Sequence, residues 1–290
     1  MFKTGHTLSR RRFLASSAVT AGTLAFGTSA YAEKKKDPYG GFKMGVQSYS
    51  LRGFKDPNVA LKHTATLGLK YWEAYPGHLP MGATPKHISD QKAILKDAGV
   101  KLLAYGVVNF DANETKSRAV FDFAKAMGIV SLSANPKKDK ATFDLLDKLC
   151  AEYKIAIAIH NHGPGALYDK VTDVHEMVND RHPLVGACVD TGHYLRSDEV
   201  PHEVIAKLGK RVFGVHLKDV KTYEQGGKKR KQFRILGEGD LDTYKCLKEL
   251  RKLKYDKCLS LEYEENPSNP LSDIEVCLKT VRDAVAKLDA

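Results

Sequence analysis

The apolar run Ile155–Ile159 constrains the fold of this chain most, because it ends directly in the polar sequence His160-Asn161-His162. Glycine and proline then stop the run at Gly163–Gly165. A short continuous apolar run bounded by such breakers predicts a strand that is buried on both faces. Strands of this kind belong to parallel sheets covered by helices, where ligands bind beyond the carboxyl ends of the strands. The sequence therefore predicts an α/β fold with His160 at a ligand-binding edge.

Three later apolar runs end in the same way, at Asp190, at His216 and at Glu262. If the four strands lie around one centre, these side chains and His160 form a site of two imidazoles and two carboxylates for a divalent metal. A single histidine at a strand end is more often a hydrogen-bonded structural group. Four buried ionisable groups without partners would each cost several kcal/mol, however, and a cation is the simplest compensation.

Strand-like and helix-like runs alternate eight times from Met44 onward, at the spacing of about 25–30 residues that is typical of a βα unit. This alternation predicts a parallel sheet that closes into a (β/α)8 TIM barrel. An open, doubly wound sheet is the alternative, but no G-x-G-x-x-G sequence follows the first strand. Residues 221–240 interrupt the rhythm and are expected to form an extra basic, glycine-rich loop, in which Gly227–Lys231 is solvated.

The amino terminus has the features of an export signal. Ser9–Leu14 contains the twin-arginine sequence, and Ala30-Tyr31-Ala32 fits a cleavage site. The apolar stretch Ala15–Phe26 is too short to span a bilayer. We therefore expect a signal peptide over residues 1–32, a linker over 33–43 and the barrel over 44–290. The mature protein is then periplasmic and meets the membrane only during export.

Charge and cysteine usage narrow the function classes. The net charge of +11 falls to +7 without residues 1–32, and the lysines are scattered along helices, so nucleic acid is an unlikely partner. Five cysteines form no C-x-x-C motif and each lies in a predicted strand or helix. Buried, unpaired thiols are the expected state.

The strand-end motifs HNHGPG, VDTGHYLRSD, VHLKD, LGEGDLD and LSLEYEENP follow one another in this order. In this order the chain resembles the sugar phosphate isomerase/epimerase superfamily with a xylose isomerase-like barrel, from about residue 44 to the end. The resemblance implies that Asp190, His216 and Glu262 are metal ligands, that Glu262 is also an acid/base, and that His193 orients substrate. Epimerases of this superfamily carry a glutamate where this chain has His160. An epimerisation that uses two carboxylate bases therefore loses one of them, which favours a lyase, a hydratase or a one-base isomerase.

Other polar residues near strand ends have a functional and a structural interpretation. Glu73 is a candidate acid/base or a rim salt bridge, and His162 is a candidate acid/base or a turn-stabilising group. Lys218 can bind a substrate oxygen or form an ion pair with Asp219 or Glu264. Tyr49 and Glu238 are candidate substrate-binding residues at the mouth, where Arg52 is also expected.

The leading functional hypothesis is a divalent-metal-dependent sugar isomerase or epimerase that acts next to the carbonyl of an unphosphorylated sugar through an enediolate. The alternatives are a keto-glycoside lyase or hydratase, a phosphodiesterase resembling endonuclease IV, and a sugar-binding barrel without activity. Ligation by oxygen and nitrogen makes manganese (Mn2+) the expected cofactor, with magnesium, zinc, iron and cobalt as alternatives. The partner is a small carbohydrate, and the sequence leaves the oligomeric state open.

Overall fold

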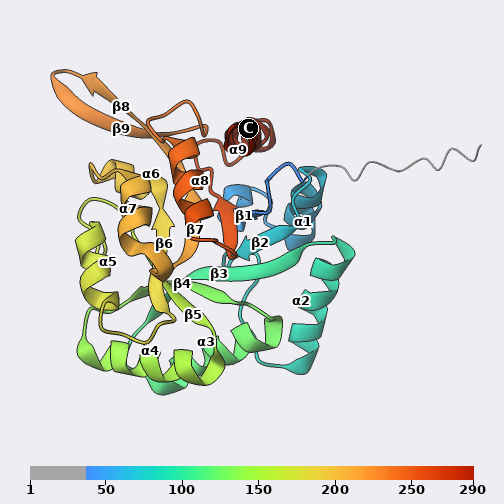
Figure 1. The fold of residues 1–290 in the computed structure, drawn as a ribbon. Helices are drawn as coiled ribbons and strands as arrows, with labels where there is room; N and C mark the ends of the chain where they lie inside the picture. The colour runs from blue at the N-terminus through green and yellow to red at the C-terminus, as the bar shows by residue number, and fades with distance from the viewer. Residues whose placement is uncertain (1–36) are drawn as a thin grey trace, which may run out of the picture. The chain divides into compact units, whose positions relative to one another are not determined.

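Eight parallel strands close into a barrel in the computed structural model, which describes residues 37–290. The strands follow in the order β1, β2, β3, β4, β5, β6, β7 and β10, and β10 pairs with β1 to close the ring. Helices surround the barrel (Figure 1). The prediction of a TIM barrel is confirmed. The signal peptide predicted for residues 1–32 lies outside the described residues and stays a prediction.

The barrel strands are β1 (Lys43–Gln47), β2 (Tyr71–Ala74), β3 (Lys101–Phe110), β4 (Ser131–Pro136), β5 (Ala156–His160), β6 (Val185–Asp190), β7 (Val212–Leu217) and β10 (Cys258–Leu261). The α-helices are α1 (Pro57–Thr66), α2 (Pro85–Asp97), α3 (Glu114–Met127), α4 (Lys140–Tyr153), α5 (Val171–Val178), α6 (Thr191–Arg196), α7 (Pro201–Leu208), α8 (Thr243–Lys252) and α9 (Leu271–Asp289). Two short 3-10 helices are η1 (Ser48–Leu51) and η2 (Gly209–Arg211). Asp56 accepts a hydrogen bond from the backbone of Asn58 and caps α1, which begins at Pro57.

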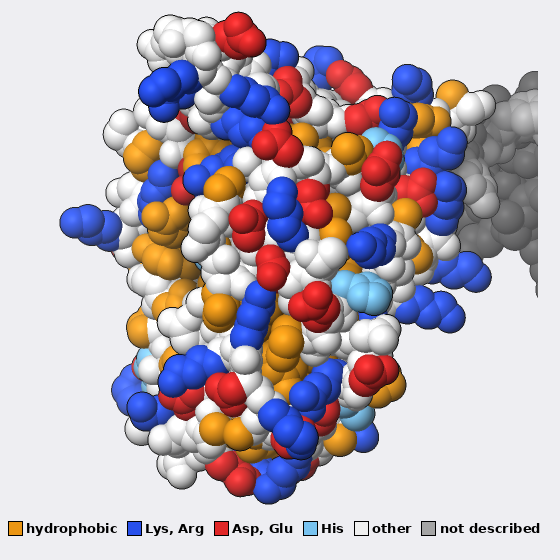
Figure 2. Space-filling view, turned by 90° about the vertical axis from the view of Figure 1, so that its left-hand side faces the viewer, with side chains coloured by type: hydrophobic (Ala, Val, Ile, Leu, Met, Phe, Trp, Pro, Cys, Tyr) orange, Lys and Arg blue, Asp and Glu red, His pale blue; other side chains and the backbone are white. Residues whose placement is uncertain are grey.

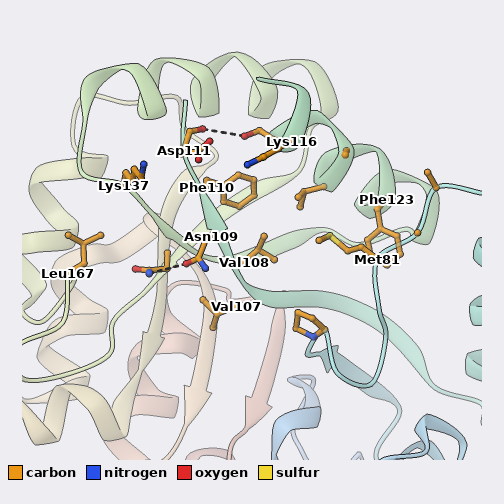
Figure 3. A pocket seen from close by; sticks show the side chains of 17 residues that line it. Met81, Val107, Val108, Asn109, Phe110, Asp111, Lys116, Phe123, Lys137 and Leu167 are labelled. Carbon is orange, nitrogen blue, oxygen red and sulfur yellow. Dashed lines mark hydrogen bonds between the residues drawn. The ribbon is translucent and has the colours of Figure 1, made fainter. Parts of the chain in front are cut away.

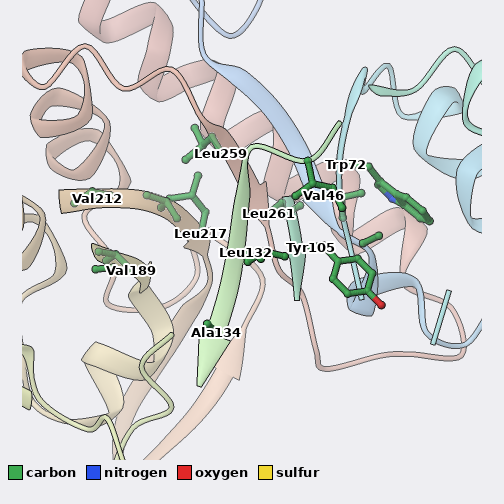
Figure 4. Close-up of a cluster of buried hydrophobic side chains, with 14 of the residues drawn as sticks. Val46, Trp72, Tyr105, Leu132, Ala134, Val189, Val212, Leu217, Leu259 and Leu261 are labelled. Atoms are coloured by element: carbon green, nitrogen blue, oxygen red, sulfur yellow. The ribbon is translucent and has the colours of Figure 1, made fainter. Parts of the chain in front are cut away.

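The hydrophobic core lies mainly between the barrel and the helices. Successive side chains of a strand point to opposite faces, so every second residue of each strand faces outward. Val46, Trp72, Leu132 and Leu261 are outward residues of four strands and are at most 1 % exposed. Figure 4 shows these side chains in the buried layer. Burial of this layer removes the apolar face of each helix from water and holds the strands in register.

The barrel interior is small and polar by comparison. Ser133, Cys188, Cys258 and Ser260 are buried and alternate with the outward hydrophobic residues of their strands. A Cβ on Gly186 would lie 2.1 Å from the carbonyl oxygen of Arg211, so glycine is needed where β6 approaches this neighbouring backbone. The same alternation places Asp190, the last residue of β6, and Glu262, the residue directly after β10, on the inner face at the carboxyl end of the barrel.

Three segments differ from the sequence prediction. Residues 221–240 are mostly a β-hairpin and not a loop, formed by β8 (Asp219–Gln225) and β9 (Lys228–Arg234), which projects from the barrel (Figure 1). The Asp219 carboxylate accepts four backbone N–H groups at the base of this hairpin. Tyr39 and Phe42, expected in a linker, are buried against the barrel unit. Helix α6 follows Asp190 directly, where the sequence pattern shows no helix.

The surface carries charge of both signs. On the face shown in Figure 2, basic and acidic side chains are interspersed among hydrophobic ones. All five cysteines are buried and unpaired, which confirms the prediction for the thiols. Among the described residues, no helix is long and apolar enough to span a membrane.

Candidate metal centre

The four predicted metal ligands converge at the carboxyl end of the barrel. His160, Asp190 and His216 end or nearly end β5, β6 and β7, and Glu262 directly follows β10. The distance from His216 Nδ1 to His160 Nε2 is 3.0 Å, and to Glu262 Oε2 it is 2.9 Å. Asp190 Oδ2 lies 3.5 Å from His160 Nε2 and 3.6 Å from His216 Nδ1. The sequence prediction that these side chains share one centre agrees with this geometry.

The donor atoms of this cluster fit a divalent cation. Ligand bonds of about 2.0–2.2 Å around one ion bring neighbouring nitrogen and oxygen ligands to separations of about 3–3.6 Å. Asp190 Oδ2 and Glu262 Oε2 are buried, and neither accepts a well-directed hydrogen bond from any described residue. Two imidazole nitrogens and two carboxylate oxygens that converge in this way form the ligand set of a mixed nitrogen and oxygen metal site.

Glu73 supports the cluster from below and does not face the cavity. Its side chain is fully buried, and its Oε1 lies 3.0 Å from His216 Nε2. The hydroxyls of Ser133 and Ser260 donate to its two oxygens at 2.5 and 2.6 Å. Burial would raise the pKa of Glu73, but His216 and these hydroxyls lower it, so the carboxylate stays charged. This placement favours an orienting role for Glu73 over the acid/base role that the sequence suggested.

Lys218 is a buried cation at the edge of the cluster. Its Nζ lies 3.0 Å from Asp190 Oδ2, 2.9 Å from Glu262 Oε2 and 2.6 Å from Glu264 Oε1. Burial alone would raise the pKa of Glu262, but the charges of Lys218 and His216 lower it to about 2. Lys218 therefore pairs with two acids of the centre and with Glu264, and its predicted alternative partner Asp219 instead binds the hairpin backbone.

The sequence Asp190-Thr191-Gly192 fixes this geometry through the backbone. Thr191 Oγ1 donates to the Lys218 carbonyl at 2.7 Å and accepts from the Lys218 N–H at 2.9 Å. Asn161 exchanges two hydrogen bonds with the Asp190 backbone and links β5 to β6. A Cβ on Gly192 would lie 2.6 Å from Lys218 Cγ, so a glycine leaves the path of the lysine side chain open.

The remaining histidines of the site, His162 and His193, are neutral and line the cavity. His160 Nδ1 lies 3.3 Å from His162 Nδ1, so a metal-ligating His160 carries its proton on Nδ1 and donates it to His162. Neutral His162 then carries its own proton on Nε2. His193 Nδ1 lies 3.0 Å from an Arg196 nitrogen and its Nε2 lies 3.5 Å from Lys218 Nζ, so a donor faces each ring nitrogen of His193. Burial lowers the pKa of His162 to about 4 and that of His193 to about 3, so both are neutral at pH 7.

A cavity of about 410 Å³ lies above the cluster, within the size range of small-molecule sites. His160, His162, His193, Lys218 and Glu262 line it. Tyr49 also lines the cavity and is 37 % exposed, as expected for a residue at the mouth. The structure does not bring Glu238 or Arg52 to the lining. Glu238 is exposed on the segment after the hairpin, and Arg52 stacks on the Tyr49 ring at 4.4 Å.

Sequence reasoning missed several residues of the lining. Arg196 and Phe233 face the cavity from α6 and from β9 of the hairpin, with Arg196 Cζ 5.6 Å from the Phe233 ring centre. Glu264, Tyr75 and Gln47 complete the wall. Glu264 and Arg196 follow motif residues by two or three positions, which is a usable signal. Phe233 lies in a segment that was expected to be a loop, and nothing in its local pattern indicates a contact with the site.

Comparison with known proteins identifies the fold family. The model of the xylose isomerase-like TIM barrel family matches residues 61–281. The chain belongs to this family. Among curated proteins it is similar to the inosose dehydratase of Clostridium botulinum, with 31 % identity over 140 residues, and to that of Lactiplantibacillus plantarum, with 30 % over 149 residues. These matches cover 43 % and 47 % of this chain, and 47 % and 49 % of the relatives, so the chain spans about half the length of the relatives it matches.

Solved structures share the barrel at low sequence identity. An uncharacterised protein from Parabacteroides distasonis has a TM-score of 0.64 at 24 % identity, over 83 % of this chain and 98 % of that protein. The IOLI protein with a zinc atom has a TM-score of 0.63 at 18 % identity, over 85 % and 98 %. A Mycobacterium smegmatis protein of the same barrel type, in complex with magnesium, has a TM-score of 0.64 at 14 % identity, over 79 % and 89 %. These similarities support the fold.

Proposed function

We propose that the protein is a divalent-metal-dependent carbon–oxygen lyase that acts next to the carbonyl of an unphosphorylated keto-sugar or keto-cyclitol. The observation that carries this proposal is the buried cluster of His160, Asp190, His216 and Glu262 at the floor of a cavity lined with hydrogen-bonding groups. A metal-ligand cluster that opens onto a small-molecule cavity is suited to catalysis rather than to a purely structural role.

The four cluster residues would hold the metal. When bound, the cation polarises a carbonyl and a neighbouring oxygen of the substrate, which lowers the pKa of the adjacent C–H bond. Ligation by two nitrogens and two oxygens suits manganese, the metal expected from the sequence. The zinc and magnesium of the two similar structures support a divalent ion of this general class.

Glu262 is the residue that would accept the proton. His162 presents an N–H group, and the ring nitrogens of His193 face the donors Arg196 and Lys218. The carboxylates Glu262 and Glu264 are therefore the available basic groups of the lining. In the absence of substrate, Lys218 and His216 lower the pKa of Glu262 to about 2 although burial opposes this, which makes it a weak base. Transfer of the Lys218 ammonium to a substrate oxygen would remove one of these two effects and would stabilise the negative charge that develops on the oxygen.

His162 would assist departure of the leaving group. Its side chain is exposed to the cavity, and its Nε2–H is free to donate to a substrate oxygen. The step requires only one base, because the carbon that loses the proton is not protonated again on its other face. Glu262 and Glu264 stand at the end of the same strand, so no cavity carboxylate among the described residues faces Glu262 from β5. The similarity to inosose dehydratases supports elimination over epimerisation.

A one-base isomerisation is the second candidate. Glu262 alone can move a proton between adjacent carbons on one face of a substrate, and this follows from the same placement of the carboxylate. A phosphodiesterase that depends on three zinc ions has less support. The candidate ligand groups of the described residues share His160 and His216, which provides one centre rather than three.

The test combines metal content with proton exchange. The protein is incubated in deuterium oxide with manganese and an inosose or a 3-keto-glucoside, and the product is followed by NMR and by the ultraviolet absorbance of a conjugated enone. We expect exchange at the carbon beside the carbonyl, together with enone formation. Glu262→Gln should abolish both, and His160→Ala should reduce metal content. Glu265→Gln is the matched control, because Glu265 pairs with Arg234 at 2.7 Å and lies outside the metal cluster.

Formation of an isomeric keto-sugar without an enone would favour the second candidate. Absence of both exchange and product with every keto substrate, in protein that carries a full complement of metal, would refute an enzymatic role of this kind.

A further inference from the structure

A second and larger cleft lies beside the polar cavity. It measures about 760 Å³ and is lined mainly by hydrophobic side chains of β3, α3 and the loops after β2 and β5. Figure 3 shows Met81, Val108, Phe110, Phe123 and Leu167 around this space. Phe110 is 3 % and Phe123 4 % exposed, whereas Met81 and Leu167 are each 45 % exposed. The cleft therefore has a closed apolar floor and an apolar rim that is open to solvent.

The cleft and the polar cavity adjoin each other. Val107, labelled in the view of the cleft in Figure 3, also lines the cavity. The adjacent residues Tyr75 and Pro76 line the cavity and the cleft respectively. The loop after β5 contributes His162 to the cavity and Leu167 to the cleft. Three segments of the barrel mouth are thus shared, so a single ligand can occupy both spaces with a polar end over the metal cluster and an apolar end in the cleft.

We propose that the cleft binds the apolar aglycone of a keto-glycoside, so that the alcohol or phenol lost in the elimination is an aromatic or similarly apolar group. This inference rests on the proposed function and specifies its substrate class. In the step, the carbon beside the carbonyl loses its proton to Glu262. The C–O bond to the aglycone on the next carbon breaks, a C=C bond conjugated with the carbonyl forms, and the aglycone oxygen takes up a proton and leaves as the free alcohol.

The chemistry of the lining selects this occupant. A free sugar needs several hydrogen-bond partners, which the polar cavity supplies and the floor of the cleft does not. The uncharged polar side chains and the one acid of the cleft wall already have partners within the protein. Asn135 Nδ2 donates to Asn109 Oδ1 at 3.1 Å, Ser117 donates to the Asp111 carbonyl at 3.4 Å, and Asp111 Oδ1 accepts from the Asn113 backbone at 2.8 Å. Lys116 and Lys137 line the cleft and are exposed, so a substituted aromatic ring can direct a polar group to solvent there.

The experiment compares two substrates that differ only in the aglycone, the 3-keto forms of phenyl β-glucoside and methyl β-glucoside. Burial of a phenyl ring should lower KM for the phenyl compound about tenfold or more relative to the methyl compound. Leu167→Asp and Met81→Asp place a charge on the apolar rim and should reduce this ratio toward one. Val276→Asp is the matched control, because Val276 is also 45 % exposed but lies on α9, outside the cleft. The control should leave the ratio unchanged.

Equal KM values for the two substrates, or equal effects of Leu167→Asp on both, would overturn the inference while leaving the lyase function in place. Calorimetry with unoxidised phenyl β-glucoside tests the case in which the cleft binds the aglycone but the lyase function is wrong. The parent protein would then bind this compound with a negative heat-capacity change, Leu167→Asp would abolish the binding, and no elimination would be seen. That result would support the cleft assignment and refute the proposed reaction. Dimerisation that is lost in Leu167→Asp, with no binding of the phenyl compound, would assign the cleft to a second copy of the chain and overturn the inference.

Discussion

Replacement of Glu73 by glutamine tests how the metal centre is supported. The carboxylate of Glu73 faces His216 Nε2 at 3.0 Å, and Ser133 and Ser260 hold both of its oxygens. The negative charge of Glu73 beside Nε2 favours a proton on that nitrogen and leaves Nδ1, which points to the cluster, available as a ligand, although the 3.0 Å contact is an ion pair rather than a well-directed hydrogen bond. A glutamine keeps the shape but removes the charge, and its amide group can no longer accept from all three donors.

The expected cost follows from the role of such supporting carboxylates. Loss of a hydrogen-bond partner behind a metal-ligating histidine typically weakens metal binding about 10- to 100-fold. This corresponds to roughly 1.4–2.7 kcal/mol. Because Glu73 is fully buried and lines no part of the cavity, its loss should act on the metal and not on the substrate. Saturation with metal should therefore restore most of kcat in the Glu73→Gln protein.

The assay is a titration of metal-free protein with manganese by calorimetry, followed by activity measurements over a range of metal concentrations. Ser133→Ala is the control, since it removes one hydrogen bond to Glu73 but keeps the carboxylate. We expect a smaller loss of affinity in this control. Unchanged metal affinity in Glu73→Gln would refute the orienting role. A kcat that stays low at saturating metal would instead support the acid/base role that the sequence suggested.

Two further predictions concern the charge state of buried groups. Lys218→Met removes the cation beside Asp190 and Glu262, so the metal-free protein should lose about 3–5 kcal/mol of stability. Manganese should then raise the Tm of this variant by more than it raises the Tm of the parent protein, and an equal rise in Tm for both proteins would contradict the prediction. Burial lowers the pKa of His78 below its ordinary value of 6.5. Below pH 6.5 the unfolded chain therefore binds a proton that the folded protein excludes, so stability falls as the pH drops from 6.5 toward the pKa of His78 in the folded protein. His78→Gln should flatten this part of the pH profile, by about 1.4 kcal/mol for each unit by which the pKa is lowered, and urea unfolding at pH 7 and pH 5 measures the difference.

The sequence predicts the barrel and the ligand cluster because both depend on local patterns. Alternation of side chains along a strand places a residue at its end on a known face, and the parallel arrangement brings the strand ends to one rim. His160, Asp190, His216 and Glu262 follow from these two rules. These two rules do not predict how deep in the barrel an inward-facing side chain lies, however. Glu73 is on the same inner face, but it lies below the cluster and not at the cavity.

Contacts between distant segments are what the sequence does not predict. The hairpin of residues 219–234 is basic and contains Gly226 and Gly227, so its composition resembles that of a loop. Its strands pair with each other along seven residue positions, and this register becomes visible only in the structure. Phe233 reaches the cavity because Asp219 anchors the base of the hairpin. The apolar cleft likewise depends on how three separate segments meet at the barrel mouth.

Charge balance connects the fold to the proposed metal. Glu73, Asp190 and Glu262 are buried carboxylates, and Lys218 is the buried ammonium beside them. These groups leave two negative charges in a region of low dielectric constant, where an uncompensated charge costs several kcal/mol. In the metal-free state a proton on His216 compensates part of this, since its acidic neighbours raise the pKa of His216 although burial opposes it. One divalent cation with a neutral His216 would balance the charge of these four buried groups, and the partly exposed Glu264 is a further acid beside Lys218. A metal at this position would therefore complete the electrostatics of the buried cluster and would weaken the need for Lys218 to stay against Glu262.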